Sequence, residues 1–146
     1  MISGEKSGTN KGGREKNNDG GETMMETEDK NVIHDAIAEE VRKKLRHQYR
    51  EIKLNPSGQR LHEFNGQYPD LILSEQGMVL ALVEIETENS ITPDKINIWK
   101  SLAGSGPRLI LMAPKAMKAR LASMLWDSGL AGKVALGSYE ISINMP

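Results

Sequence analysis

The sequence predicts an α/β domain in which a central mixed β-sheet is flanked by helices, in the order αβββαβαβ. Two kinds of pattern support this class. Short apolar runs between turn residues are typical of strands, whereas apolar residues that recur every three or four positions are typical of helices. One apolar run, Met78–Val83, is continuous rather than alternating. We therefore expect both faces of that strand to be buried, as in the centre of a sheet.

The composition limits the chemistry that the chain can perform. Its 146 residues suffice for one domain with a modest core. Cysteine is absent, which excludes disulfides and thiolate metal sites. A bound metal would need oxygen ligands, with help from His34, His47 or His62, and this favours a hard cation such as Mg²⁺, Mn²⁺ or Ca²⁺. The net charge of −1 argues against tight, autonomous binding to nucleic acid.

The chain is expected to divide into two parts. Residues 1–31 are rich in Gly, Asn, Glu, Lys, Ser and Thr, and they cannot bury enough apolar surface to offset their ordering entropy. They predict a disordered N-terminal tail, followed by a single α/β domain over residues 32–146. No apolar run approaches the roughly 20 residues of a membrane span, and the N-terminus lacks the apolar core of a signal peptide. A cytoplasmic location is therefore expected.

The domain is expected to begin with a basic amphipathic helix. Apolar residues at helical spacing run from Ile33 to Ile52, after a possible cap at Asn31 and before the turn that starts at Asn55. The basic face of this helix either is solvated or contacts the phosphates of a nucleic acid. Its basic residues are Arg42, Lys43, Lys44, Arg46 and Arg50.

Five strands and two more helices are expected after this helix. Asn65-Gly66 is a strong hairpin signal, and Thr92-Pro93-Asp94 predicts the start of a helix. The first three strands are expected to pair in antiparallel fashion. The expected elements are strands over 60–64, 68–73 and 78–86, a helix over 93–102, a strand over 108–113, a helix over 115–126 and a strand over 134–136.

The end of the central strand is acidic. Residues two apart in a strand share a face, so Glu84, Glu86 and Glu88 are expected to point the same way. Asp70, on the paired strand, approaches them from the side. Carboxylates repel one another and cost free energy when they are desolvated. An acidic cluster at the end of a buried strand therefore indicates a bound cation.

The second predicted strand begins with Pro69-Asp70, and the third ends with the pair Glu84 and Glu86. With these residues, the predicted order of elements resembles that of the PD-(D/E)XK nuclease superfamily. Members of this superfamily have the restriction-endonuclease-like fold. The resemblance covers about residues 32–138. It implies that Asp70 and Glu84 match the two metal-binding acids of the superfamily motif.

One position departs from this motif. The lysine that the superfamily carries two residues after the second acid is replaced by Glu86. Some restriction enzymes of the superfamily also have Glu there and are active. In other members the lysine lies on the following helix, where Lys95 and Lys100 are the candidates here. A Glu on the first helix sometimes supports the site, which points to Glu39 or Glu40.

Two function classes follow. The first is a metal-dependent nuclease-like hydrolase that cleaves phosphodiester bonds in nucleic acid. Mg²⁺ or Mn²⁺ would neutralise the scissile phosphate and lower the pKa of a bound water, and Lys95, or Glu86 as a base, would orient that water. The second is a catalytically inactive restriction-endonuclease-like module with a binding or regulatory role. The alternative to a metal site is that Glu84, Glu86 and Glu88 form a solvated strand end, which Lys95 and Lys100 neutralise. The predicted catalytic residues are Asp70, Glu84, Glu86 and Lys95, and the predicted metal ligands are Asp70, Glu84 and Glu86.

Overall fold

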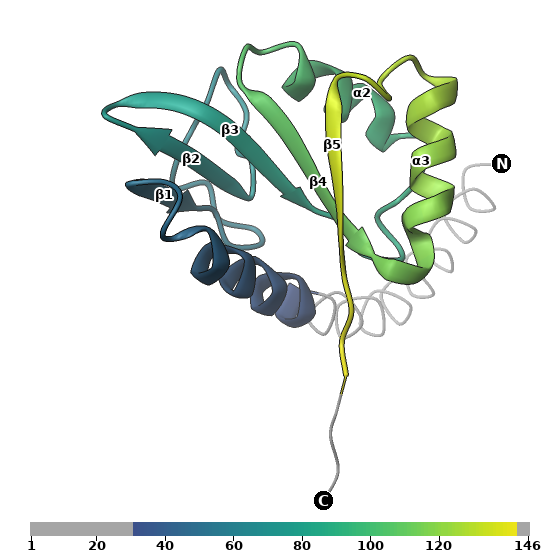
Figure 1. Ribbon diagram of the computed structural model, residues 1–146, viewed down its shortest axis with the longest axis horizontal. Helices are drawn as coiled ribbons and strands as arrows, with labels where there is room; N and C mark the ends of the chain where they lie inside the picture. Colours follow the sequence, from purple (N-terminus) through teal and green to yellow (C-terminus); the bar gives the residue numbers. More distant parts are fainter. Residues whose placement is uncertain (1–30, 143–146) are drawn as a thin grey trace, which may run out of the picture. The chain divides into compact units, whose positions relative to one another are not determined.

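The computed structural model describes residues 31–142, and within them a five-stranded sheet has the strand order β1-β2-β3-β4-β5 (Figure 1). The first three strands pair in antiparallel fashion, whereas β3, β4 and β5 are parallel. This mixed sheet confirms the predicted α/β class. The strands are β1 (Glu51–Leu54), β2 (Leu71–Glu75), β3 (Met78–Ile85), β4 (Arg108–Pro114) and β5 (Val134–Tyr139).

The sheet belongs to the compact unit His34–Pro146. The tail predicted over residues 1–31 lies outside the described residues except for its last residue, which is helical. Among the described residues, no helix has the length and apolar character that crossing a membrane requires.

Helices pack on both faces of the sheet. A first helix covers residues 31–45, α2 covers Lys95–Ala103, and α3 covers Lys118–Asp127 after the short 3₁₀ turn η1 (Lys115–Met117). One core lies between the sheet and the pair α2 and α3, and it includes Trp99 and Leu121. The second core lies between the opposite face and the first helix, and it includes Ala38.

Strand β3 occupies the centre of the sheet, as the continuous apolar run predicts. Leu82 belongs to the core under α2 and α3, whereas Val83 and Ile85 belong to the core under the first helix. This alternation follows from the two-residue period of a strand. The expected burial of the whole run Met78–Val83 is wrong at its start, because Met78 and Leu80 are exposed and the buried part of β3 begins at Ala81.

The first strand was predicted in the wrong place. Residues 51–54 form β1, although they were expected to end the first helix, which stops at residue 45. Ile52 and Leu54 pack on the core of the first helix. Their spacing of two residues is that of one face of a strand, although Ile52, seven residues after Leu45, also continues the helical spacing. The expected strand over 60–64 is a loop with one isolated bridge, in which Phe64 pairs with Gln67 around the Asn65-Gly66 turn.

A tight turn and a β-bulge together set the register that places the acidic residues. Gln76 and Gly77, between β2 and β3, both have positive φ angles (51° and 79°), which suits a two-residue hairpin loop. The register then shifts by one residue between Leu73 and Ser74, so that Leu71 lies opposite Val83. The other predicted boundaries move by a few residues: α2 begins at Lys95 rather than at Pro93, and β5 extends to Tyr139.

Candidate active site at the end of the central strand

Asp70 and Glu84 are adjacent because of the hairpin register. One residue beyond the Leu71–Val83 pair, the two acids face each other across β2 and β3. The Asp70 amide donates a hydrogen bond of 2.9 Å to Glu84 Oε2, and the Ile85 amide donates one of 2.7 Å to Asp70 Oδ2. Each carboxyl group is therefore held by a backbone amide of the opposite segment.

Glu84 is an acid in an unfavourable environment. The residue is only 8% exposed. Burial raises its pKa well above the ordinary value of 4.5, and the negative charge of Asp70 raises it further, while the hydrogen bond from the Asp70 amide and the charge of Lys95 act in the opposite direction. Glu84 consequently keeps its proton to a higher pH than an ordinary glutamate.

Glu86 is fully buried, with an exposed fraction of 0%, so the solvated strand end that was considered as an alternative does not describe it. Its Oε1 accepts a 2.6 Å hydrogen bond from Ser90 Oγ, and its Oε2 accepts a 2.8 Å hydrogen bond from Trp99 Nε1. Its backbone carbonyl accepts a 2.7 Å hydrogen bond from the Tyr139 hydroxyl. Glu86 thus connects β3 to α2 and β5.

The predicted approach of Lys95 to the acidic residues is confirmed. Lys95 Nζ lies 3.5 Å from Glu86 Oε1. Lys100, the second candidate, is exposed. Glu88 was expected to share a face with Glu84 and Glu86, but β3 ends at Ile85 and Glu88 is exposed in the turn that follows.

The contribution of the first helix comes from His34. Its Nε2 lies 3.0 Å from Asp70 Oδ2, and its Nδ1 lies 3.0 Å from Asp35 Oδ1 and 3.0 Å from Ser57 Oγ. Burial lowers its pKa, but hydrogen bonds and charge from Asp70 and then Asp35 outweigh this effect and raise the pKa to about 9. The sequence alone predicts no such contact for His34, which is only one of three histidines that could help to bind a metal.

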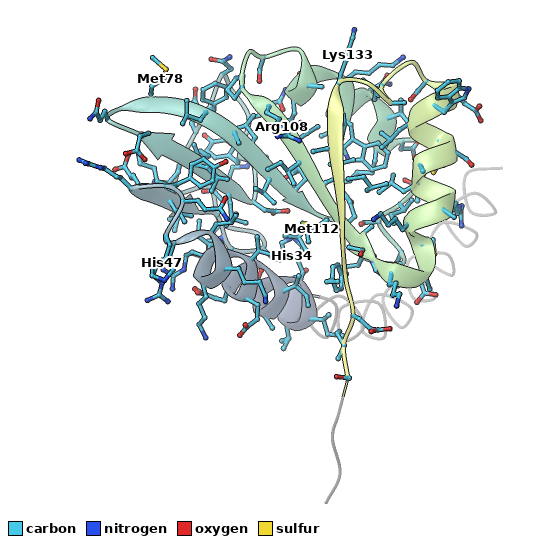
Figure 2. The ribbon with its side chains drawn as sticks, in the orientation of Figure 1. His34, His47, Met78, Arg108, Met112 and Lys133 are labelled. Carbon is cyan, nitrogen blue, oxygen red and sulfur yellow. The ribbon has the colours of Figure 1, made fainter. Side chains whose placement is uncertain are left out.

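The glutamates expected to support the site from the first helix instead pair along that helix. Glu39 Oε2 lies 2.8 Å from Arg42 Nη2, and Glu40 Oε1 lies 3.5 Å from Lys43 Nζ. Neither has a hydrogen bond or ion pair to Asp70 or Glu84 within residues 31–142. His47 is exposed beyond the other end of the helix (Figure 2).

Asn55 fixes the segment that carries Asp70, a role that sequence analysis did not predict. Its side-chain amide donates hydrogen bonds of 2.7 Å to the carbonyls of Pro69 and His62. Its side-chain oxygen accepts hydrogen bonds from the amides of Leu61 and His62. The buried side chain therefore ties the loop after β1 to the Pro69-Asp70 motif.

The basic residues proposed as a nucleic-acid surface are mostly paired with acids. Besides the pairs of Arg42 and Lys43, Arg50 Nε lies 2.9 Å from Glu75 Oε1. By contrast, within the part of the chain that the structure describes, Lys115 and Lys118 form no ion pair. Both are exposed and follow β4, at the edge where the carboxyl ends of β3, β4 and β5 lie.

The carboxyl groups fit a cation to different degrees. Over residues 31–142, no group of three His, Cys, Asp or Glu side chains is arranged to hold a metal ion. Glu86 does not fit, because both of its oxygens already accept hydrogen bonds in a buried site. Asp70 and Glu84 are carboxylates, the type of ligand of which Mg²⁺ commonly takes one or two while waters and phosphate oxygens fill its other positions.

Comparison of the chain with protein-family models, with curated proteins and with solved structures found no match.

Proposed function

We propose that this domain is a restriction-endonuclease-like nuclease that uses Mg²⁺ or Mn²⁺ to hydrolyse phosphodiester bonds in nucleic acid. The observation that carries the proposal is the pairing of Asp70 with Glu84 at the end of the central strand, through hydrogen bonds from the backbone of the opposite segment. The observed order of helices and strands agrees with the order on which the resemblance to this superfamily depends.

Burial of Glu84 supports a cation at this position. Placing its carboxyl group beside Asp70 away from water costs free energy, which the raised pKa of Glu84 reflects. A divalent cation between the two acids would remove that cost. When bound, such a cation neutralises charge on a phosphate and lowers the pKa of a coordinated water.

The roles of the chain's own residues follow from their contacts. Asp70 and Glu84 would hold the cation. Glu86 holds Ser90 and Trp99, and it places the Lys95 ammonium at the same end of the sheet. Lys95, whose side chain is 27% exposed, is the candidate to supply positive charge to a phosphate.

A cleavage assay tests this function. The purified protein is incubated with single-stranded, duplex and branched nucleic acids in Mn²⁺ or Mg²⁺. We expect cleavage that Asp70→Asn, Glu84→Gln and Lys95→Ala each abolish. Glu88→Gln is the matched control, because this exposed acid lies just beyond the site, and it should cleave normally. Cleavage that persists in Asp70→Asn would point to a contaminating nuclease and contradict the proposal.

One observation favours the non-catalytic alternative. The residue at the position of the motif lysine, Glu86, accepts hydrogen bonds from Ser90 and Trp99 and attracts Lys95. Lys95, the candidate to replace the motif lysine, is thus already paired with the buried carboxylate of Glu86. A protein that binds nucleic acid but cleaves none of the three substrates with either metal would support this alternative, in which the fold serves binding or regulation.

A further inference from the structure

His34 connects the candidate site to a second acid. Its side chain is 15% exposed. Its Nε2 faces Asp70 Oδ2 at 3.0 Å, and its Nδ1 faces Asp35 Oδ1 at 3.0 Å. Carboxylate oxygens only accept hydrogen bonds, so this geometry suits an imidazole ring with a hydrogen on each nitrogen.

One oxygen of Asp70 takes two donors. Asp70 Oδ2 lies 3.0 Å from His34 Nε2 and accepts the 2.7 Å hydrogen bond from the Ile85 amide. Rotation of the Asp70 carboxylate about its Cβ–Cγ bond would break both contacts. His34 and the amide together therefore fix the plane of the carboxylate.

His34 is itself held in place. The Ser57 hydroxyl and amide donate hydrogen bonds of 2.8 Å and 3.0 Å to Asp35 Oδ1, and Ser57 Oγ lies 3.0 Å from His34 Nδ1. This chain of contacts runs from the loop after β1, through the first helix, to the segment that precedes β2. A side chain that is constrained from both ends is suited to orient its partner.

We infer that His34 is a positioning residue, which fixes the Asp70 carboxylate for cation binding through its Nε2–H donor. The cation-binding part of this inference rests on the proposed function, whereas the orientation of Asp70 does not. Within residues 31–142, His34 thus takes the supporting place on the first helix that the resemblance assigned to Glu39 or Glu40.

Two uncharged variants separate the hydrogen bond from the charge. His34→Gln keeps an N–H donor near the position of Nε2, and His34→Leu removes the donor. Because both remove the positive charge, their difference reports the donor alone. We expect His34→Leu to bind Mn²⁺ about 10–100-fold more weakly than His34→Gln, the usual cost of losing a residue that orients a metal ligand. Isothermal titration calorimetry measures both affinities.

A second measurement needs no metal. The Ile85 amide shares Asp70 Oδ2 with His34, so its NMR resonance reports the orientation of that carboxylate. We expect His34→Gln to keep this resonance near its wild-type position and His34→Leu to shift it. His34→Met is a second donor-free variant in case His34→Leu does not fold, and His47→Leu, at an exposed histidine, is the control that should leave the resonance unchanged.

The two measurements distinguish the two ideas. If the wild-type protein binds no Mn²⁺, the proposed function fails, and the Ile85 resonance alone decides the role of His34. A shift in the donor-free variants without a shift in His34→Gln supports the positioning role. The positioning role is overturned if His34→Gln and the donor-free variants have the same Ile85 resonance. It is also overturned if the wild-type protein binds Mn²⁺ and these variants bind it with equal affinity.

Discussion

The Asp70 amide donates a 2.9 Å hydrogen bond to Glu84 Oε2, so the backbone of one candidate ligand supports the side chain of the other. This contact favours the ionised form of Glu84, yet burial and the negative charge of Asp70 outweigh it. Glu84 is thus oriented as a ligand would be while its ionisation remains unfavourable. The balance between these effects on the pKa of Glu84 has measurable consequences for the free energy of unfolding.

The first prediction concerns the pH dependence of folding. Because the pKa of Glu84 is higher in the folded protein than its ordinary value of 4.5, the folded state binds more protons above that pH. The free energy of unfolding should therefore decrease as the pH rises above about 4.5 and through the folded pKa. Glu84→Gln, which cannot ionise, should show a smaller decrease in metal-free buffer.

Chemical denaturation of both proteins from pH 4 to pH 9 checks this prediction. His34, whose pKa is raised to about 9, adds stability below about pH 6.5 that is lost as the pH rises through 9. The contributions of His34 and Glu84 both decrease the free energy of unfolding as the pH rises. The effect of Glu84 is therefore isolated only by the difference in this free energy between wild type and Glu84→Gln. A difference that does not change with pH would show that Glu84 has no raised pKa.

The second prediction concerns the missing motif lysine. Glu86→Lys restores the residue type of the superfamily motif, but it places a cation beside Lys95 and the N–H of Trp99 in a fully buried position. An unpaired buried charge costs about 3–5 kcal/mol. We therefore expect Glu86→Lys to lose about that much stability.

Thermal and urea denaturation measure this loss. Glu88→Lys makes the same change of residue at an exposed position two residues away, and its free energy of unfolding should stay within about 0.5 kcal/mol of wild type. If Glu86→Lys were as stable as Glu88→Lys, this result would contradict the burial and hydrogen bonding of the Glu86 carboxylate.

Much of the fold follows from local patterns. The turn at Gln76-Gly77 and the continuous apolar run after it were sufficient to place β3 at the centre. The register shift between Leu73 and Ser74, which brings Asp70 opposite Glu84, does not follow from these patterns. The strand β1 was missed because Ile52 continues the helical spacing of the preceding residues, while its two-residue spacing to Leu54 is too short a pattern to indicate a strand by itself. Tertiary packing on the core under the first helix decides between helix and strand.

The polar contacts of the site could not be predicted in the same way. His34 and Ser57 are 23 residues apart, and their contact depends on how the loop after β1 folds over the first helix. Glu86 is buried because α2 brings the indole of Trp99 to its carboxylate. Neither partner follows from sequence spacing, since a single polar residue has no period that indicates its burial.

The third prediction concerns Asn55. Replacement by alanine removes the hydrogen bonds to the Pro69 carbonyl and to the Leu61 amide, among others. Backbone groups that lose their partners in a buried site cost about 1–3 kcal/mol. We expect Asn55→Ala to lose at least that much stability and to shift the NMR resonance of the Asp70 amide.

Asn89→Ala is the control for this change, because Asn89 lies exposed in the turn after β3. Its free energy of unfolding should stay within about 0.5 kcal/mol of wild type, and its Asp70 amide should keep its position. Equal stability of the Asn55 and Asn89 variants would show that Asn55 does not hold the loop.

The last prediction concerns which surface would bind nucleic acid under the proposed function. Arg42 and Lys43 each have an acidic neighbour on the first helix, which already compensates their charge. Lys115 and Lys118 have none within residues 31–142, and they follow β4 at the same edge of the sheet as Glu84 and Glu86. Ligands of open α/β sheets bind at the carboxyl ends of the strands.

We therefore expect Lys115→Gln/Lys118→Gln to weaken duplex DNA binding more than Arg42→Gln/Lys43→Gln, although each pair removes the same charge. Fluorescence anisotropy at several salt concentrations distinguishes the two variants. Each lost phosphate contact should reduce the slope of log K against log salt by about 0.9, so the first double variant should lose nearly 2 and the second much less. A larger loss in the Arg42 and Lys43 variant would instead place the nucleic acid on the first helix, because the intrahelical acids would then have failed to compensate its charge.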